Sequence, residues 1–377
     1  MDETPMVPPQ DAQDADAARL LHLRQAQLPK GAPLALPLTL ASMFQLPGEP
    51  APGVPGYGRA DNPTWEALEH MLEALEGAPA LAFPSGMAAI SAALFATLRA
   101  GDRLLLPSDG YYTPRTLASR FLERLGITVD TRPTSGFAEG GFAGVRVVYI
   151  ETPSNPGLDL VDLPAVTQAV RSAGGISIVD NTTMTALGQR PLDLGADILL
   201  ASDTKAPGGH SDLLMGHVAT RDPDLLAAMR DWRTLSGGIP GPFEAWLLHR
   251  SLETLELRFD RMCTNAEILA AHLDAHPAVQ GLRFPGLLTH PGHALAARQM
   301  RRMGFLLGFT LPSAEAADRF IEACPLIAPA TSFGGVHTTA ERRARWGDDV
   351  APGFVRLSVG TEPAGALVAA VVGALDG

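Results

Sequence analysis

Two charged side chains follow apolar segments whose composition predicts neighbouring strands. Asp180 ends one of these segments, and Lys205 follows the next, with Ser202 and Thr204 just before it. An amine can form a Schiff base with an aldehyde, and a carboxylate can keep a pyridine nitrogen protonated. Hydroxyl groups beside the amine can hold a phosphate. Together these residue types predict a pyridoxal 5′-phosphate (PLP) site at the ends of two strands.

Two further motifs place polar groups where ligands bind in α/β proteins. Ser85, Gly86 and Met87 open an apolar helix, whose first N–H groups and dipole attract an anion. Asn155 lies in the polar tip 151–156 that follows another strand. Ligands of an open parallel sheet bind at the carboxyl ends of its strands, so we expect these motifs to meet there.

Each signal has a simpler interpretation when it is taken alone. Ser85 is typical of a helix cap, Asp180 can cap the next turn, and Lys205 can be a surface lysine. The tip around Asn155 can be an ordinary proline-rich turn. A buried aspartate is costly unless it meets a cation, and the four motifs together favour the PLP site.

The elements that must position these residues follow an alternating pattern. Apolar strands alternate with helices, which predicts an α/β protein with a mostly parallel sheet covered on both faces. The expected strands are 80–83, 103–107, 127–131, 145–151, 176–180, 192–200 and 216–220. The expected helices begin at 63 and end at Gly77, run from 85 to about 98, and cover 113–125 and 163–173.

The pattern changes after the Gly/Pro-rich segment 237–242. A helical segment from 243 to about 276 is followed by candidate strands at 279–284, 304–311, 326–328 and 354–359 and a helix at 314–323. This predicts a smaller C-terminal α+β domain. The predicted divisions are an N-terminal arm (1–53), a PLP-binding domain (54–240) and a C-terminal domain (241–377). Residues 1–16 are polar and acidic, which predicts disorder there.

The composition is that of a globular protein, and it excludes several classes of partner. Apolar residues make up 46% and charged residues 19% of the 377 residues. A net charge of −12 argues against nucleic acid or an anionic membrane as a partner. The only cysteines, Cys263 and Cys324, are expected to be reduced core residues, so no disulfide and no metal site is predicted. Without a secretory signal or a long apolar run, we expect a cytoplasmic protein.

Longer motifs also occur along the chain, in a characteristic order. They are Tyr57-Gly58-Arg59-x-x-Asn62-Pro63-Thr64, Ser85-Gly86-Met87, Pro153-x-Asn155-Pro156, Val179-Asp180-Asn181-Thr182, Ser202-x-Thr204-Lys205, Gly208-Gly209-His210-Ser211-Asp212, Arg298-Gln299-Met300, Ser332-Phe333-Gly334-Gly335 and Arg356-Leu357-Ser358-Val359-Gly360. From about residue 33 to the C-terminus, this order resembles the Cys/Met-metabolism (transsulfuration) family of PLP enzymes. The family includes cystathionine lyases and synthases, methionine γ-lyase and O-acylhomoserine sulfhydrylases.

The resemblance implies PLP fold type I, the aspartate-aminotransferase-like fold, and roles for individual residues. By match, Lys205 would bind the PLP aldehyde, Asp180 would pair with the pyridine nitrogen, and Tyr111 would stack on the ring and move protons. The phosphate would be held by Gly86, Met87, Ser202 and Thr204. The substrate α-carboxylate would be held by Asn155, Ser332 and Arg356, and the far end of the substrate by Arg115 and His337.

The resemblance also implies a homo-oligomer. Tyr57 and Arg59 match residues that reach the phosphate of a neighbouring subunit, so a dimer with shared sites is expected. In the family, two such dimers usually form a tetramer. The arm (1–53) would contact that neighbour. Without the resemblance, Arg356 would be interpreted as a strand-edge salt bridge.

Three positions depart from the family pattern. Ala206 stands where relatives carry a tyrosine after the lysine, and His337 stands for a common glutamate. The common Tyr-Gly-Gly-Thr segment is Tyr111-Tyr112-Thr113-Pro114 here. We interpret these changes as affecting the substrate end of the site, with Ala206 as a sign of an altered substrate entrance.

The sequence is most similar to the bacterial cystathionine γ-lyases of the family. This predicts a carbon–sulfur lyase that converts cystathionine to cysteine, 2-oxobutanoate and ammonia. The alternatives are γ-replacement by a cystathionine γ-synthase or O-acylhomoserine sulfhydrylase, then a methionine γ-lyase or a cystathionine β-lyase. A more distant alternative is a non-catalytic protein that binds a phosphate ligand. The chain lacks Gly-x-Gly-x-x-Gly and Gly-Lys-Ser/Thr loops, which counts against that alternative.

Overall fold

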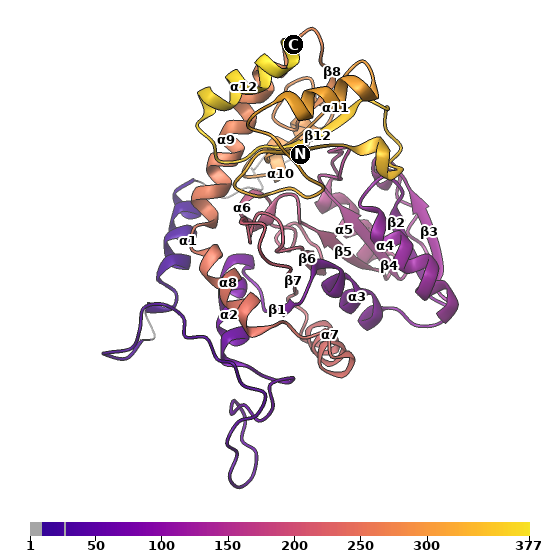
Figure 1. Ribbon diagram of the computed structural model, residues 1–377. Helices are drawn as coiled ribbons and strands as arrows, with labels where there is room; N and C mark the ends of the chain where they lie inside the picture. The colour runs from indigo at the N-terminus through magenta and orange to yellow at the C-terminus, as the bar shows by residue number, and fades with distance from the viewer. Residues whose placement is uncertain (1–9, 26–27) are drawn as a thin grey trace.

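The computed structural model describes residues 10–25 and 28–377, and its framework is formed by two sheets (Figure 1). Across the larger sheet the strands are β1 (Ala80–Phe83), β7 (Gly216–Ala219), β6 (Ile198–Ala201), β5 (Ile176–Asp180), β4 (Val147–Glu151), β2 (Arg103–Pro107) and β3 (Thr128–Arg132). Of these strands only β7 runs opposite to the others, because it pairs antiparallel with both β1 and β6. The predicted α/β class with a mostly parallel sheet is therefore confirmed.

Helices cover both faces of this sheet because its strands are apolar on both sides. Successive residues of a strand point to opposite faces. In β4, Val147 and Tyr149 pack into one apolar cluster, whereas Val148 and Ile150 pack into the other. The first cluster is covered by α3 (Gly86–Thr97) and α7 (Pro223–Ser236), and the second by α2 (Pro63–Glu76), α5 (Leu163–Ser172) and α8 (Pro242–Leu252).

The smaller sheet belongs to the C-terminal part of the chain. Its strands, in order, are β10 (Ala328–Pro329), β11 (Thr339–Arg342), β12 (Phe354–Ser358), β9 (Leu306–Thr310) and β8 (Gln280–Arg283). Their apolar side chains form a third cluster with α9 (Leu255–Asp274), α11 (Ala314–Ala323) and α12 (Ala364–Asp376). In Figure 1 these orange and yellow elements lie above the larger sheet.

Several predicted elements differ in detail from the observed ones. The helix expected from 243 to 276 is two helices, α8 and α9, because the Thr254 N–H bonds to the Ser251 carbonyl and closes the first helix. The helix expected at 113–125 is α4 (Tyr112–Leu117) followed by a π turn (Ala118–Leu122) and a 3-10 turn (Glu123–Leu125). Of the strand expected at 192–200, only β6 forms.

Other elements were not predicted. Residues 10–16 were expected to be disordered, but they begin α1 (Gln10–His22), and the prediction is wrong there. Leu20, near the end of that helix, is buried in the core beside α2, which anchors the helix. Residues 1–9 lie outside the described residues. The other elements without a prediction are α6 (Thr185–Gly188), α7, α10 (His293–Gln299), the 3-10 turns Thr134–Glu139 and Arg343–Trp346, β11 and α12.

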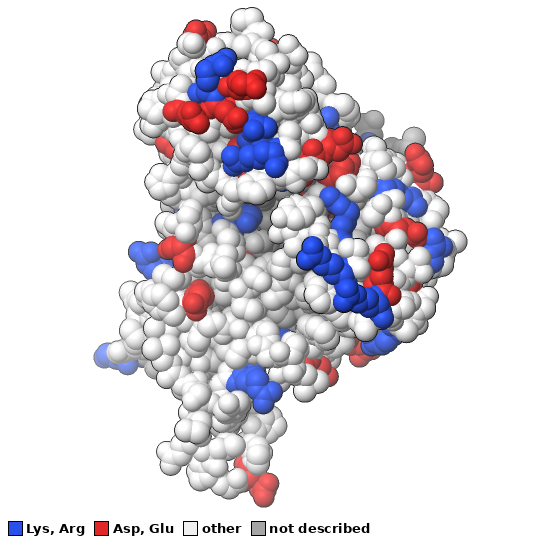
Figure 2. Space-filling model, turned by 45° about the vertical axis from the view of Figure 1, so that its right-hand side comes forward, with Lys and Arg blue, Asp and Glu red and all other residues white. Residues whose placement is uncertain are grey.

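The segment 28–62, called the arm from here on, extends from the body of the chain and overlaps the N-terminal arm predicted over 1–53 (Figure 1). Its only strand-like pairing is an isolated antiparallel bridge between Met43 and Tyr57. Large apolar side chains on the arm are exposed, among them Leu34, Leu40 and Met43. In Figure 2 the lower part of the molecule is mostly free of charged side chains, whereas opposite charges are interspersed over the upper and right-hand parts.

Both cysteines, Cys263 and Cys324, are buried free thiols, as predicted. Burial raises the pKa of the Cys263 thiol, so this thiol is unreactive. Within residues 10–25 and 28–377, no helix combines the length and the hydropathy that a membrane crossing needs.

A buried charge cluster joins α2 to the strands behind the lysine. His217 of β7 lies between two carboxylates, with Nδ1 2.9 Å from Asp203 and Nε2 3.2 Å from Glu76. All three side chains are buried. Burial alone would lower the pKa of His217, but the two carboxylates outweigh it and raise this pKa to about 10. The imidazolium therefore links α2, β7 and the turn that carries Lys205.

We expect this cluster to make stability depend on pH. Because folding raises the pKa of His217, its protonated ring stabilises the folded protein. This stabilisation is fully present below the pKa of the unfolded chain, about 6.5, and is lost as the pH rises through the folded-state pKa of about 10. Between pH 7 and 10 the free energy of unfolding should fall by about 3 kcal/mol more in the native protein than in His217→Gln. Denaturant unfolding at fixed protein concentration with excess PLP measures this difference.

The control is His276→Gln, which removes a histidine paired with Asp376 at the surface. This variant should keep the pH dependence of the native protein. Equal slopes for His217→Gln and the native protein would contradict the assignment of a cationic His217.

Candidate active site

Most of the predicted site residues line one cavity of about 480 Å³. It lies at the carboxyl ends of the parallel strands, as the topology of an open sheet requires. The predicted residues in its wall are Gly86, Met87, Tyr111, Asn155, Asp180, Ser202, Thr204, Lys205, Ser332 and Arg356. Residues up to 270 positions apart in the sequence are thus brought together in one site.

Lys205 presents its amine inside this cavity. Its Nζ lies 5.3 Å from the centre of the Phe333 ring. Burial and the nearby Arg356 guanidinium lower the pKa of the amine, and Asp180 opposes them. A lowered pKa leaves more of the amine unprotonated, which is the form that attacks an aldehyde and accepts a proton.

The turn after the lysine is held by a buried arginine. Arg258 of α9 donates from Nη1 to the carbonyl of Ala206 at 2.6 Å and from Nη2 to that of Pro207 at 3.0 Å. Burial lowers the pKa of Arg258 to about 10, so the side chain remains a cation near neutral pH. A charged donor on two carbonyls fixes the chain direction beyond Lys205.

Ala206 does not line the cavity itself, and the altered substrate entrance that we infer from it stays a prediction. The residue is fully buried. Gly334, with φ +80°, lies so close that a Cβ there would be 2.5 Å from the Ala206 nitrogen. The backbone of the loop around Gly334 therefore packs directly on Ala206 and separates it from the substrate space.

Asp180 is a buried carboxylate at the end of β5. Tyr149 donates its hydroxyl to Oδ2 at 2.6 Å, and the Thr182 N–H bonds Oδ1 at 3.0 Å. Burial raises the pKa of Asp180, whereas these bonds and the charge of Lys205 oppose the increase. A cation next to Asp180, such as a protonated ring nitrogen, would restore its ordinary ionisation.

The opposite end of the cavity is suited to an anion. Ser85 caps α3 through its Oγ, which accepts the Ala88 N–H at 3.1 Å, and the helix begins at Gly86. A Cβ on Gly86 would lie 2.7 Å from Cβ of Ser202, so only glycine allows the helix end to approach β6 this closely. The positive end of the helix dipole and the Ser202 hydroxyl thereby meet at one point.

These residues fit PLP. The cavity holds one amine, a buried carboxylate that requires a cation, and a helix N-terminus beside hydroxyl groups. PLP carries an aldehyde, a protonated ring nitrogen and a phosphate that match these three features. The match is therefore one of chemical groups: each of the three groups of PLP has a complementary group in the wall of the cavity.

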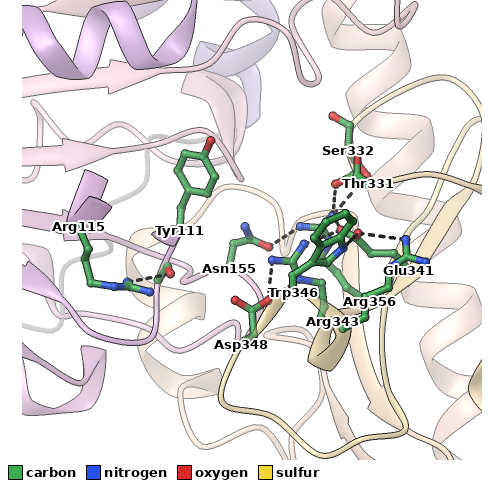
Figure 3. Close-up of polar contacts among 12 residues, drawn as sticks. Tyr111, Arg115, Asn155, Thr331, Ser332, Glu341, Arg343, Trp346, Asp348 and Arg356 are labelled. Carbon is green, nitrogen blue, oxygen red and sulfur yellow. Dashed lines mark hydrogen bonds and ion pairs between the residues drawn. The ribbon is translucent and has the colours of Figure 1, made fainter. Parts of the chain in front are cut away.

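Another part of the cavity wall is formed by Arg356 (Figure 3). Arg356 donates from Nη1 to Oδ1 of Asn155 at 2.6 Å and from Nη2 to the carbonyls of Thr331 and Ser332. Burial lowers the pKa of Arg356 to about 10, which keeps it cationic. A planar guanidinium held in this way can bind a carboxylate through two parallel hydrogen bonds.

Four predicted residues lie elsewhere in this chain. Tyr57 and Arg59 are on the arm, where the Arg59 guanidinium lies 5.6 Å from the Tyr57 ring centre. Arg115 is not among the residues that line the cavity, and its Nη1 donates to the carbonyls of Pro107 and Gly110. His337 is exposed and does not line the cavity. The roles predicted for these four residues stay predictions.

Glu151 is a site residue whose importance the sequence did not indicate. It is buried at the end of β4, in register with Asp180, and it lines the cavity. Its two oxygens accept the backbone N–H groups of Tyr111 at 2.6 Å and Asn155 at 3.1 Å. Burial and the charge of Asp180 raise the pKa of Glu151 to about 8. The carboxylate thus joins the two loops that carry predicted site residues.

Other residues around the cavity were also missed. Tyr149 could have been noticed as a tyrosine in an aliphatic strand, two residues before Glu151 and therefore on the same face. Three more lie in or just after β11, a strand whose sequence has no strand pattern. They are Glu341, Arg343 and Trp346, and no signal in the sequence connects them to the site.

The whole chain was also compared with known protein families and structures. The model of the family described as "Cys/Met metabolism PLP-dependent enzyme" matches residues 20–376. The chain is 50% identical to a Streptomyces coelicolor protein named "Putative cystathionine gamma-lyase", over 89% of this chain and 87% of that protein. It is 38% identical to the cystathionine gamma-lyase of Bacillus subtilis, over 85% and 88%.

Solved structures give the same result for the fold. The cystathionine gamma synthase of Xanthomonas oryzae, solved in complex with cystathionine, superposes with a TM-score of 0.91 at 33% identity and covers 98% of both chains. Other relatives are named cystathionine beta-lyase and L-methionine gamma-lyase. The similarity therefore spans enzymes with several related reactions.

The close approach of three segments at the anion end yields a test. A Cβ on Gly216 would lie 2.7 Å from Cα and N of Gly86. Gly216→Ala should displace the start of α3 and weaken PLP binding about tenfold, because overpacking of this kind is relieved only by backbone shifts. Titration of the apoenzyme with PLP, followed by absorbance, measures the affinity.

Gly373→Ala is the matched control, because a Cβ at Gly373 meets nothing within 4 Å. Its PLP affinity should equal that of the native protein. An unchanged affinity in Gly216→Ala would show that α3 does not hold the phosphate.

The bridging position of Glu151 yields a second test. An amide in Glu151→Gln keeps one acceptor oxygen but turns an NH₂ group toward the other backbone N–H. One buried N–H then lacks an acceptor, which costs about 1–3 kcal/mol. Amide hydrogen exchange in peptides that contain Tyr111 or Asn155 should become about tenfold faster in at least one of them.

The control here is Glu123→Gln, which changes an exposed glutamate. It should leave the exchange of both peptides unchanged. If Glu151→Gln also leaves both unchanged, the carboxylate does not hold the two loops together.

Proposed function

This chain belongs to the Cys/Met metabolism family of PLP-dependent enzymes, and we propose that within this family it is a cystathionine γ-lyase. The reaction converts cystathionine and water to cysteine, 2-oxobutanoate and ammonia. The observation that carries this proposal is the 50% identity with a relative of that name over 89% of the chain. The amine, carboxylate and arginine that line one cavity supply the groups that such a reaction needs.

The residues that would hold PLP come from the larger sheet and its loops. Lys205 would bind its aldehyde, and Asp180 would hold a proton on its ring nitrogen. Ser202, Thr204 and the N-terminus of α3 at Gly86 would bind its phosphate. When bound, PLP supplies a covalent attachment for the substrate amine and a ring that withdraws electrons from the neighbouring bonds.

The remaining chemistry is proton transfer by two side chains. We assign removal of the proton on the substrate Cα to Lys205 Nζ, whose lowered pKa suits a base. Cleavage of the Cγ–S bond also requires removal of a β-proton and delivery of a proton to the leaving sulfur. Lys205 and the hydroxyl of Tyr111, which both line the cavity, are the groups we assign to these steps.

Substrate orientation is assigned to the groups around Arg356. Its guanidinium would bind the α-carboxylate together with Asn155 and Ser332. Arg356 and Asn155 already contact one another, so the two groups are positioned before a substrate enters. Fixing the carboxylate places the Cα–H bond near Lys205, which lowers the entropic cost of proton transfer.

We also propose that the arm pairs with a second copy of this chain. Tyr57 and Arg59 lie outside the cavity of their own chain, and the arm exposes large apolar side chains such as Leu40 and Met43. Apolar side chains grouped on an extended arm are stabilised by burial against a partner. Assembly as a dimer, and as a tetramer formed by two dimers, would cover them.

The product distinguishes the proposed reaction from its relatives. With cystathionine, the purified enzyme with bound PLP should release 2-oxobutanoate, whereas β-elimination would release pyruvate. Both 2-oxo acids can be identified by chromatography of the reaction mixture. Lys205→Ala should lose the visible colour of bound PLP and should form neither product above background, a loss of at least about a thousandfold.

A γ-replacement enzyme is the second candidate, supported by the TM-score of 0.91 with a cystathionine gamma synthase. If cystathionine yields no 2-oxo acid while an O-acylhomoserine and a thiol yield a thioether, the lyase proposal is wrong. If pyruvate is the main product, the chain is a β-lyase.

A further inference from the structure

A buried carboxylate, Glu341, lies behind the arginine that faces the substrate (Figure 3). Glu341 is on β11, directly opposite Arg356 of β12 in the antiparallel pairing. Opposed residues of two antiparallel strands point to the same face, so their side chains meet. Only 1% of Glu341 and 2% of Arg356 is exposed, so water contributes little to either charge.

One oxygen of Glu341 contacts two guanidinium groups. Its Oε1 pairs with Nη2 of Arg356 and lies 2.6 Å from Nη1 of Arg343. Nη2 of Arg343 also lies 2.6 Å from Asp348. Arg343 is therefore already paired with two carboxylates and is less available than Arg356 to a substrate carboxylate. Arg356 is thus held by Glu341 on one side and by Asn155 on the other, and its plane is set by both.

The other oxygen of Glu341 fixes a ring in the cavity wall. Its Oε2 accepts the indole N–H of Trp346 at 2.9 Å. Trp346, Arg343 and Arg356 all line the cavity. Trp346 itself is about half exposed, so this hydrogen bond is the main polar contact that orients its ring.

The charges of the cluster do not balance, and the excess positive charge favours one more anion. Three arginines, Arg343, Arg345 and Arg356, surround two carboxylates, Glu341 and Asp348, and Arg345 lies 3.7 Å from Glu341. The formal balance is one positive charge. A substrate α-carboxylate would neutralise it, whereas an uncharged ligand would not.

We propose that Glu341 is a positioning residue for substrate binding. It orients Arg356 toward the α-carboxylate and at the same time holds Trp346 as the adjoining wall of the substrate space. The inference rests on the carboxylate-binding role that the proposed function gives Arg356, but it does not depend on which sulfur amino acid is cleaved. Glu341 itself does not contact the substrate.

Binding of two small amines tests the proposal without any turnover of cystathionine. Glycine carries an amine and a carboxylate, and methylamine carries only the amine. In Glu341→Gln the affinity for glycine should fall about tenfold or more, although the cluster becomes more positive, because Arg356 loses the partner that fixes its orientation. The affinity for methylamine should stay within about twofold. The absorbance change of bound PLP on titration reports both affinities, and the PLP content of the variant is measured first.

Two further variants complete the test. Asp318→Asn is the matched control. Asp318 of α11 pairs at 3.0 Å with Arg342, the neighbour of Glu341 on β11, but it lies outside the cavity. It should bind both amines as the native protein does. Trp346→Phe keeps a ring and removes only the N–H, and it should weaken glycine binding about threefold without changing methylamine binding.

Equal losses for glycine and methylamine in Glu341→Gln, or no loss for glycine, would overturn the proposal. If Glu341→Gln does not fold, Trp346→Phe decides: unchanged glycine binding there contradicts the role of Glu341. If the native protein binds glycine no better than methylamine, then Arg356 does not recognise the carboxylate and the proposed function itself is at fault.

Discussion

The burial of charge at the carboxyl edge of the larger sheet is the constraint on which the site depends. Asp180 and Glu151 end adjacent parallel strands in register, and both are buried. Two carboxylates this close repel one another, so each requires donors or a cation. Tyr149 and three backbone N–H groups supply donors, but these bonds and the charge of Lys205 only partly offset burial, and the pKa of Asp180 stays raised. The site therefore has an unmet demand for positive charge that a protonated cofactor ring satisfies.

The parts of the site that the sequence predicted are those that strands and helix starts determine locally. Asp180, Lys205 and Gly86 each follow or begin an apolar element, so the topology of the sheet brings them to one edge. The element pattern predicted the larger sheet for the same reason. Strand β11 has almost no apolar pattern, and its residue Glu341 could be assigned only from the structure.

The residues whose placement could not be foreseen depend on the path of a loop. Arg115 has a side chain suited to a distal carboxylate, but two backbone carbonyls of its own loop bind its guanidinium instead. Ala206 is adjacent to Lys205 in sequence, yet the backbone at Gly334 covers it. Proximity along the chain does not give the direction of a side chain, and a resemblance to relatives gives it only where the loops agree.

The two functions of the cavity come from different parts of the chain. The groups assigned to PLP lie on the larger sheet and its loops, whereas Arg356 and Glu341 lie on the smaller sheet. Asn155, in the loop that follows β4, joins the two through its 2.6 Å bond with Arg356. The placement of one sheet against the other therefore sets the distance between Arg356 and Lys205, and with it the position that we propose for the substrate carboxylate. A substitution that shifts the smaller sheet would alter substrate binding before it altered cofactor binding.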